Sequence, residues 1–377
     1  MENKELEFEY INNKYTNLNG AKYYKVISEK MKEIHSKIPI QSFNVSNVAA
    51  TDIREENFEG VNCKRLVMYL MSNGCEWALK SGNGCSMCGH IAKQTRKDEL
   101  ISTENYILQF KSEFNKYDFK NYPILNLYNN GSFMNDNEIP SEARREILKT
   151  ISENENIKMV VIETRPEFVT EEKIIEIKKI LRNKRVEIAM GLEVYEDKYR
   201  YTCLNKGFSL AQFEKASKII VENVYLRTYV MLKPPFLTEK ESIDEAIKTI
   251  KYAFSIGAST VSLETCTIQD YTLVNYLYSK KIYNTAWLWS ILEVVKNTAH
   301  LGKVIVGLFQ FYPSADKVPF NCEKCSNKVL DSIVDYNRTL DIKSFEDISC
   351  ECKLEWEKNL KEAEKDELEI RVIKSLL

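Results

Sequence analysis

The stretch Asn73–His90, NGCEWALKSGNGCSMCGH, follows the apolar run Leu66–Met71 and decides how the rest of the chain is interpreted. It contains three cysteines, Cys75, Cys85 and Cys88, on a segment punctuated by glycines. Three closely spaced thiolates can hold three irons of a cubane iron–sulfur cluster and leave the fourth iron open to an exchangeable ligand. Glycine tolerates positive φ and close approach, so the segment suits a loop around an inorganic core. We therefore predict a [4Fe-4S] cluster at the end of a first strand.

Zinc is the alternative for this loop. Zinc takes four ligands and commonly combines two short cysteine hooks. The nearest candidates for a fourth ligand are His90, beyond the last loop cysteine, and Cys63, on the far side of the strand. Spacing alone leaves this alternative open, whereas the position of the loop after a strand favours the cluster. We expect Cys63, Cys203 and Cys266 to be small core residues.

Composition is typical of a globular protein in a reducing compartment. The chain has 377 residues, of which 44% are apolar, and a net charge of −2. No run approaches the roughly 18 apolar residues of a membrane span, and the polar N-terminal sequence is unlike a signal peptide. Ten cysteines without such a signal indicate metal or redox use rather than disulfides. We therefore expect a cytoplasmic location and no membrane partner; the net charge gives no overall basic field for nucleic acid.

Downstream of the loop, short apolar runs alternate with helix-like segments, as in a parallel sheet or barrel. Runs that are apolar on both parities suit strands buried on both faces. The predicted fold class is α/β, a (β/α) barrel that is either partial with six strands or nearly complete, with a small cysteine-rich, metal-binding C-terminal extension. The predicted strands are Leu66–Met71, Ile124–Tyr128, Met159–Ile162, Val186–Met190, Val224–Met231, Thr260–Leu263 and Lys303–Leu308.

We divide the chain into three parts. Residues 1–60 form an N-terminal cap segment, irregular except for one helix at Ala21–His35. Residues 61–317 form the barrel domain, and residues 318–377 form the C-terminal extension, with a charged helix at Lys353–Glu367.

Several barrel helices carry local start and stop signals. Ser209 and Thr238 each begin a capping box, in which the first and fourth residues satisfy each other's backbone donors. Ser141 and Thr170 are predicted to be N-caps. Gly257 is predicted to close the helix that follows Thr238, because glycine adopts the left-handed conformation without strain.

The spacing C-x9-C-x2-C of the loop resembles the Elp3-like branch of the radical S-adenosylmethionine (SAM) superfamily. The sequences Glu163–Glu167 (ETRPE) and Gly191–Glu193 (GLE), after two predicted strands, are similar to the same branch. Over roughly residues 60–355 the ordered motifs resemble the subgroup that contains the radical SAM subunit of archaeosine synthase. The other motifs of that set are Gly131–Phe133, Asn205–Phe208, Lys233–Glu239, Gln269–Thr272 and Trp287–Trp289.

The resemblance implies a SAM molecule bound to the open iron by residues at several strand ends. Arg165 would clamp the SAM carboxylate, and Glu163 would accept hydrogen bonds from the amino group or the ribose. An ion pair that merely closes a barrel loop, and an ordinary Asn-Gly turn, are the structural alternatives. The predicted SAM contacts are Met87, Asn130, Gly131, Ser132, Glu163, Arg165 and Glu193.

The extension contains a second cysteine group, Cys322-x2-Cys325 and Cys350-x-Cys352. Four thiolates in two short hooks fit tetrahedral zinc or an auxiliary iron–sulfur cluster. Small terminal segments often need such a staple because their own core is thin. We favour structural zinc and leave the second cluster open.

For function, the resemblance implies that the reduced cluster cleaves SAM to a 5′-deoxyadenosyl radical, which abstracts a substrate hydrogen. It further implies tRNA modification, with archaeosine-type cleavage of a C–N bond in a lysine–deazaguanine adduct. The implied partners are a ferredoxin or flavodoxin, tRNA and a transglycosylase-like protein. Two alternatives stay open: a radical SAM enzyme for a small metabolite or peptide, and a zinc-stabilised binding protein without activity.

Overall fold

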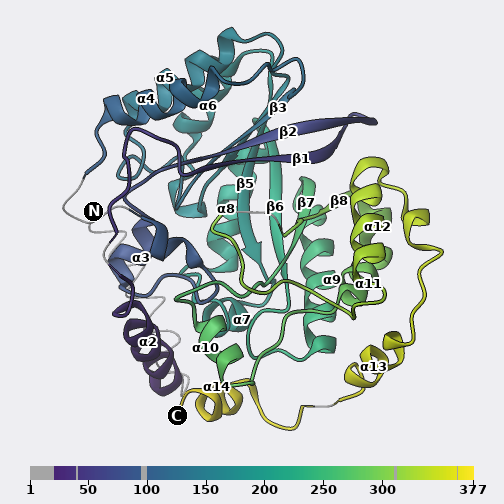
Figure 1. Cartoon of the computed structure of the whole chain (residues 1–377). Coiled ribbons are helices and arrows are strands. Elements are labelled where there is room, and N and C mark those ends of the chain that lie inside the picture. The colour runs from purple at the N-terminus through teal and green to yellow at the C-terminus, as the bar shows by residue number, and fades with distance from the viewer. Residues whose placement is uncertain (1–20, 40, 95–99, 310–311, 363) are drawn as a thin grey trace.

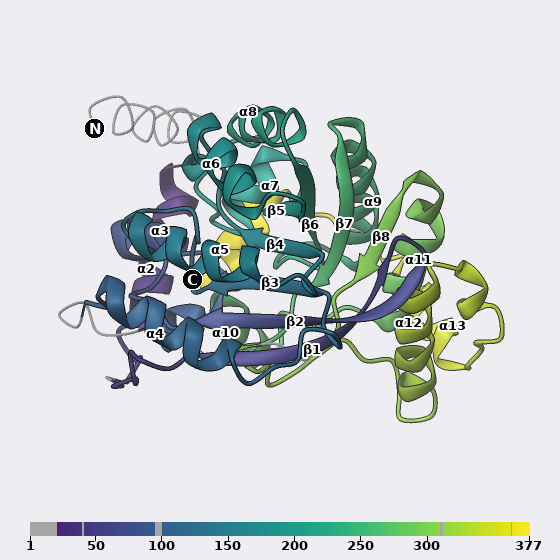
Figure 2. The same ribbon diagram turned by 90° about the horizontal axis from the view of Figure 1, so that it is seen from above.

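The computed structural model describes residues 21–39, 41–94, 100–309, 312–362 and 364–377. Within them, eight strands form one curled sheet in the order β1 to β8, so each strand lies beside its neighbour in sequence. β1 is antiparallel to β2, and the strands from β2 to β8 are parallel to one another. Figures 1 and 2 show this half-barrel with helices along its outer side. The predicted α/β class is therefore confirmed, with the barrel present as an eight-stranded half-barrel.

The strands have a clear inner and outer face. Outward residues such as Leu66, Leu125 and Val160 belong to the main apolar core under the helices. Inward residues such as Arg65 and Asn126 include many polar groups, because the inner face surrounds a lumen. The strand bounds are β1 Ala50–Phe58, β2 Val61–Leu70, β3 Ile124–Asn129, β4 Met159–Glu163, β5 Arg185–Glu193, β6 Tyr225–Leu232, β7 Ala258–Thr265 and β8 Lys303–Val306.

Helices follow the strands around the outside in chain order, and most of them contact the next helix in this layer. The last of them, α12, packs against the edge strand β1 and so covers the seam between the first and last strands (Figure 1). This outer layer consists of α4 Thr103–Phe114, α5 Ser141–Glu153, α6 Glu171–Leu181, α8 Leu210–Val221, α9 Glu239–Ser255, α11 Leu288–Thr298 and α12 Ser326–Thr339.

A second group of helices lies near the carboxyl ends of the strands. Residues of α2, α10 and α14 form an apolar cluster there, together with Met231, Cys266 and the buried Cys203. The bounds of this group and of the remaining helices are α2 Ala21–His35, α3 Glu76–Ser81, α7 Asp197–Thr202, α10 Leu273–Ser279, α13 Cys352–Asn359, α14 Leu368–Leu376, η2 Gly89–Lys93, η3 Pro166–Phe168, η4 Ala299–Leu301 and η5 Ile342–Phe345.

The predicted helix signals are confirmed at four of five positions. Both capping boxes are present, at Ser209 and Thr238, and Thr170 accepts a hydrogen bond from the backbone of the first turn of α6. Gly257, with φ +94°, follows the end of α9. Ser141 is wrong as an N-cap: it is the first residue of α5, and the cap position is occupied by the residue before it.

Two predictions for the chain ends are wrong. The segment before residue 61 contains β1, which forms a hairpin with β2, so it is not irregular outside its helix. The charged helix at Lys353–Glu367 is shorter than predicted, since α13 ends at Asn359 and a separate helix, α14, begins at Leu368. The three-part division of the chain stays a prediction.

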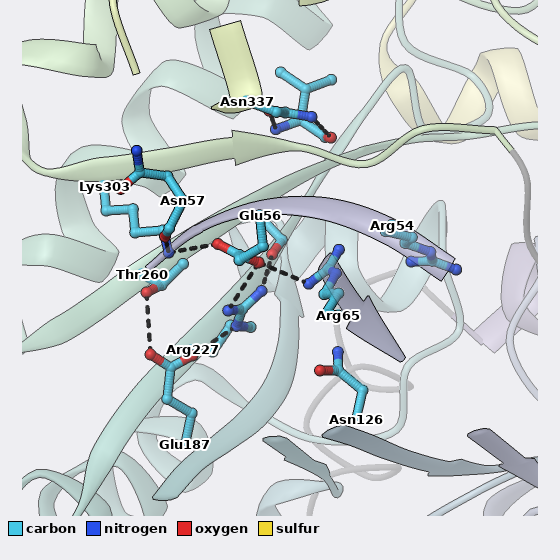
Figure 3. Close-up of polar contacts among 12 residues, drawn as sticks. Arg54, Glu56, Asn57, Arg65, Asn126, Glu187, Arg227, Thr260, Lys303 and Asn337 are labelled. Carbon is cyan, nitrogen blue, oxygen red and sulfur yellow. Dashed lines mark hydrogen bonds and ion pairs between the residues drawn. The ribbon is translucent and has the colours of Figure 1, made fainter. Parts of the chain in front are cut away.

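A buried cluster of charges closes the amino-terminal end of the lumen (Figure 3). Glu56 of β1 lies 3.1 Å from Arg65 and 3.5 Å from Arg227, and it also pairs with Lys303 at the start of β8. Arg227 lies 2.8 Å from Glu187 of β5. Strands β1 and β8 lie at opposite ends of the sheet order, so these ion pairs join the two edges where no backbone ladder does.

In the described residues, no helix combines the length and the apolar composition that crossing a membrane requires.

Candidate cluster and cofactor site

The three loop cysteines come from one short segment after β2. Cys75 is the N-cap of α3, and Cys88 is the N-cap of η2, with Cys85 between them. The backbone N–H of Cys88 donates to the carbonyl of Cys85 at 3.1 Å. Gly82 ends α3 with φ +71°, a left-handed conformation that glycine adopts readily and that turns the chain back.

Two other loops hold this segment in place. The indole N–H of Trp77 donates to the carbonyl of Asn205 at 2.9 Å, and the Asn205 amide donates to the Gly84 carbonyl at 2.6 Å. On the other side, the backbone N–H of Gly89 donates to the side chain of Gln269 at 3.0 Å. Both Asn205 and Gln269 belong to motifs that the sequence analysis singled out, so the structure brings these motifs to the cysteine loop.

One cavity at the carboxyl edge of the sheet is lined by all three loop cysteines. Four of the seven predicted SAM contacts line the same cavity: Asn130, Gly131, Glu163 and Arg165. The donor set fits the implied cofactors, because thiolates suit iron and a nearby carboxylate and guanidinium suit the amino and carboxylate groups of SAM.

Three predicted SAM contacts do not line this cavity. Met87 packs into the apolar cluster of α2, α10 and α14. Ser132 is fully buried, and its hydroxyl accepts the backbone N–H of Arg165 at 3.1 Å. Glu193 is turned toward Lys206, 2.8 Å away, from a left-handed position at φ +66°. Each of these three side chains therefore contacts neighbouring residues of the protein instead of facing the cavity.

Arg165 is held by its surroundings on several sides. Its Nε donates to Glu167 at 2.6 Å, and a terminal nitrogen donates to the Lys206 carbonyl at 2.7 Å. The guanidinium also lies over the rings of Trp77 and Phe208, at 5.4 and 5.3 Å from their centroids. These contacts fix a positive charge at the wall of the cysteine cavity.

Glu138, which was not predicted as a site residue, joins the cysteine loop to the turn after β3. Its carboxylate accepts the backbone N–H of Glu76, next to Cys75, at 2.9 Å, and the Asn129 amide at 3.0 Å. It also accepts the backbone N–H of Ser132. Nothing in the local sequence separates this carboxylate from an ordinary surface acid of the loop.

Gly131 has to be glycine because of these neighbours. A Cβ at this position would lie 2.0 Å from a Glu138 oxygen and 2.9 Å from the backbone of Cys75. The Asn-Gly turn predicted as an alternative therefore has a specific reason, the close approach of the cysteine loop.

Glu163 faces the cavity at the end of β4. Burial raises the pKa of its carboxyl to about 8, and repulsion from Glu193 and Glu264 acts in the same direction against attraction from Lys206. His90 also lines the cavity, and its Nδ1 lies 3.1 Å from the Asn130 side chain. Burial lowers the pKa of His90 to about 4, so its imidazole is neutral at pH 7.

The four tail cysteines gather at one point beside α11 and α12. The sulfur of Cys322 lies 3.5 Å from that of Cys325 and 3.6 Å from that of Cys350, and the sulfurs of Cys325 and Cys352 are 3.5 Å apart. All four lie within 4.8 Å of one another. The indole of Trp289 donates to Cys352 at 3.4 Å.

In the described part of the chain, this is the one group of His, Cys, Asp and Glu side chains gathered closely enough to hold a single metal ion. The loop cysteines with His90 are not gathered in that way, which fits a larger inorganic core better than a lone zinc ion. Cys63 lies on the inner face of the sheet, in another apolar cluster. The zinc alternative for the loop thus lacks the convergence that the tail shows.

A much larger cavity, of about 990 Å³, lies apart from the cysteine loop. It is lined by Lys233, Trp287 and residues of α13 and α14, among them Asn359 and Arg371. None of the loop cysteines reaches it, so the motifs Lys233–Glu239 and Trp287–Trp289 belong to a different part of the molecule from the cysteine site.

The curled parallel sheet, with the cysteine loop at its carboxyl edge, has the arrangement that the resemblance to radical SAM proteins implies. The chain is 33% identical over 336 residues to archaeosine synthase subunit beta of Methanosarcina acetivorans, a match that covers 89% of this chain and 96% of the relative. It is 30% identical over 313 residues to the same subunit of Thermococcus kodakarensis, covering 80% and 94%. The chain belongs to the archaeosine synthase subunit beta family, as the sequence motifs predicted.

Solved structures show more distant similarity. The archaeal Elp3 of Methanocaldococcus infernus matches with a TM-score of 0.45 at 16% identity, over 62% of this chain and 59% of that one. Methylornithine synthase matches with a TM-score of 0.46 at 12% identity, over 75% and 70%. No protein-family profile matches the sequence.

Proposed function

We propose that the chain carries a [4Fe-4S] cluster on Cys75, Cys85 and Cys88 and binds SAM at the open iron. The observation that carries this proposal is the convergence of the three cysteines, Glu163 and Arg165 on one cavity. When bound, the cluster supplies the electron that cleaves SAM.

The chain's own residues have distinct roles in this proposal. Arg165, fixed by Glu167 and by two aromatic rings, holds the SAM carboxylate by charge-assisted hydrogen bonds. Glu163 and the Asn130–Gly131 turn receive the amino group and ribose. Glu138 accepts backbone hydrogen bonds from both the cysteine loop and the turn after β3. These bonds hold the two segments together, so the cavity is formed before the cofactor binds.

For the substrate, we propose tRNA, with cleavage of a C–N bond in a lysine–deazaguanine adduct. The support is the name of the relatives, archaeosine synthase subunit beta, together with the nearly full-length match. A protein named as a beta subunit implies a partner subunit, and the transglycosylase-like protein is our candidate. A ferredoxin or flavodoxin supplies the electron, and the reaction takes place in the cytoplasm.

For the tail, we propose a single zinc ion on Cys322, Cys325, Cys350 and Cys352. Four sulfurs at about 2.3 Å from one zinc are about 3.8 Å apart in a tetrahedron. The sulfur separations of 3.5 and 3.6 Å agree with one ion and support zinc over a second cluster. This zinc fixes α13 beside α11.

The test of the substrate is the tRNA of a strain that lacks this protein. Its nucleosides, measured by mass spectrometry, are expected to accumulate a lysine-bearing deazaguanosine and to lose archaeosine, and the wild-type gene restores both. Unchanged tRNA nucleosides in the deletion strain would contradict this function and favour a small metabolite or peptide.

A further inference from the structure

The lumen has an aromatic floor above the buried charges. Tyr69 and Tyr128 lie edge to face with centroids 5.3 Å apart, and the hydroxyls of Tyr128 and Tyr229 meet at 2.7 Å across the sheet from β3 to β6. His90, which lines the cysteine cavity, has its ring 6.4 Å from that of Tyr69. Tyr312 lies beside both of these rings, with its centroid 5.9 Å from that of Tyr69 and 6.0 Å from that of His90. The aromatic cluster therefore reaches the cysteine cavity through His90, and a planar group that binds against it in place of Tyr312 lies close to the cysteine loop.

Two acidic side chains lie near the carboxyl ends of their strands, Glu163 at the end of β4 and Glu264 near the end of β7. Glu264 is on the inner face of its strand, like Thr260, whose hydroxyl donates to a buried carboxylate at 3.4 Å. Within the described residues, no ion pair or side-chain hydrogen bond joins Glu163 or Glu264 to a cationic group. Burial is the main cause that raises the pKa of Glu264, against attraction from Arg54 and Arg65, and Glu264 in turn contributes to the raised pKa of Glu163.

The Glu264 carboxylate lies next to Gly307, where the absence of a side chain leaves space for it. A Cβ on Gly307, directly after β8, would lie 1.9 Å from one Glu264 oxygen. Glycine at this position therefore lets the carboxylate occupy the space between β7 and β8. Arg54, Arg65 and Arg227 attract Glu264 electrostatically, but no salt bridge of the described residues includes it. A buried acid that is not paired at short distance, close to an aromatic cluster, is an arrangement that suits a ligand.

The charge of the lumen indicates what the ligand is. Glu163 and Glu264 offer carboxyl oxygens that accept hydrogen bonds from N–H groups, which suits the polar edge of a base better than a phosphate. Enzymes that act on a base in nucleic acid extrude it into a pocket, stack it on aromatic side chains and read its polar edge. An aromatic floor under a free acceptor meets these requirements.

We propose that Glu264 binds the substrate, and that its carboxylate accepts the N–H edge of a nucleobase extruded from tRNA and lying over Tyr69, Tyr128 and Tyr229. This inference rests on the proposed function, and it adds the base-binding subsite, close enough to Glu163 for the two acids to interact. Glu264 is then a specificity residue, and it leaves cluster and SAM binding to others.

The test uses tRNA from the deletion strain as substrate for the cluster-loaded protein. Glu264→Gln is expected to lower kcat/KM for this tRNA roughly 10- to 100-fold, the effect of losing a charge-assisted hydrogen bond. Cluster absorbance and the Kd for SAM should stay within about twofold of wild type. Glu222→Gln, on the exposed end of α8, is the matched control and should change nothing.

A second variant acts on Glu264 without removing it. Gly307→Ala displaces the flexible end of the Glu264 side chain and no backbone, so it should reproduce the defect in tRNA turnover. The double variant should be no worse than either single variant, because both act on one contact.

Binding gives a readout apart from activity. Wild-type protein should bind tRNA of the deletion strain more tightly than mature tRNA of the parent strain, and Glu264→Gln should lose this preference. Normal preference and turnover in Glu264→Gln would overturn the subsite, as would loss of SAM binding in that variant. A wild-type protein that cleaves no SAM would instead refute the proposed function, while the binding preference would still decide the role of Glu264.

Discussion

At the scale of single residues, two carboxylates are used in opposite ways. Glu138 is 3% exposed and surrounded by donors, so it serves as a fixed brace between Cys75 and the turn after β3. Glu163 faces the cavity and, within the described residues, has no cation paired with it by a short contact. Glu138 therefore has a structural role, whereas Glu163, at the cavity wall and without a short ion pair, can bind a ligand.

The pH dependence of stability reports on Glu163. Its pKa in the folded protein, about 8, is above its ordinary value of 4.5, so the folded state binds the proton more tightly than the unfolded state. Stability from this group is therefore present below pH 4.5 and is lost as the pH rises through 8. We expect Glu163→Gln to raise the Tm relative to wild type at pH 8.5 and to have little effect at pH 5.

Thermal unfolding of the cluster-loaded protein without SAM at the two pH values measures this difference. Glu222→Gln, an exposed acid, should show the same Tm as wild type at both. An equal change in Tm for Glu163→Gln at pH 5 and pH 8.5 would show that the folded protein does not raise the pKa of Glu163.

At the scale of elements, the cysteine loop depends on the loop that follows α7. Gly207 has φ +73°, and a Cβ there would lie 2.3 Å from the ring of Trp77, which is itself hydrogen-bonded to Asn205. Gly207→Ala should therefore displace α3 and lower the iron content after anaerobic reconstitution severalfold.

Gly60→Ala is a matched control for this prediction. Gly60 has φ +83°, and nothing lies within 4 Å of a Cβ placed on it. It carries the same left-handed penalty, of about 1 kcal/mol, without the collision. Equal iron content in the two variants would mean that the contact with Trp77 does not position the loop.

The elements also show what the sequence could and could not predict. The parallel strands were predictable because strands buried on both faces are apolar on both parities. β1 escaped this pattern, since Asp52, Arg54 and Glu56 are charged and face the lumen or its rim. The break between α13 and α14 was hidden because charged residues continue through it.

Site residues followed the same rule. The loop cysteines and Arg165 could be proposed from the sequence because their spacing or motif is local, and the structure places them at one cavity. Glu138 and Glu264 were missed, because an isolated glutamate has no pattern and gains its role only when the sheet brings distant segments together. Met87 and Glu193 do not line this cavity for the same reason: sequence position gives the loop, and packing decides which way a side chain points.

At the scale of the whole molecule, the buried ion pairs around Glu56 hold the two edges of the half-barrel together (Figure 3). Removing one member of such a network leaves a buried charge without its partner. Arg227→Met should therefore lower the free energy of unfolding by about 3–5 kcal/mol. Lys240→Met, in an exposed pair with Asp244, should cost less than about 1 kcal/mol.

Acid unfolding checks the same network. Burial raises the pKa of Glu56, but attraction by Arg227 and Arg65 overcomes it and lowers the pKa to about 2. Its contribution to stability is thus complete above pH 4.5 and is lost as the pH falls toward 2. In Arg227→Met the acid-unfolding midpoint should move to higher pH. An unchanged midpoint, with an unchanged free energy of unfolding, would show that the edges are held by packing alone.

The central claim is that three cysteines anchor an iron–sulfur core whose open corner activates SAM. The most direct measurement is anaerobic reconstitution, followed by metal analysis and assay of 5′-deoxyadenosine after reduction with SAM present. The account predicts about four irons and one zinc per chain, formation of 5′-deoxyadenosine by wild type, and loss of both the iron and the product in Cys85→Ala. A Cys63→Ser control should behave as wild type. Iron-free protein, or undiminished 5′-deoxyadenosine from Cys85→Ala, would contradict the account.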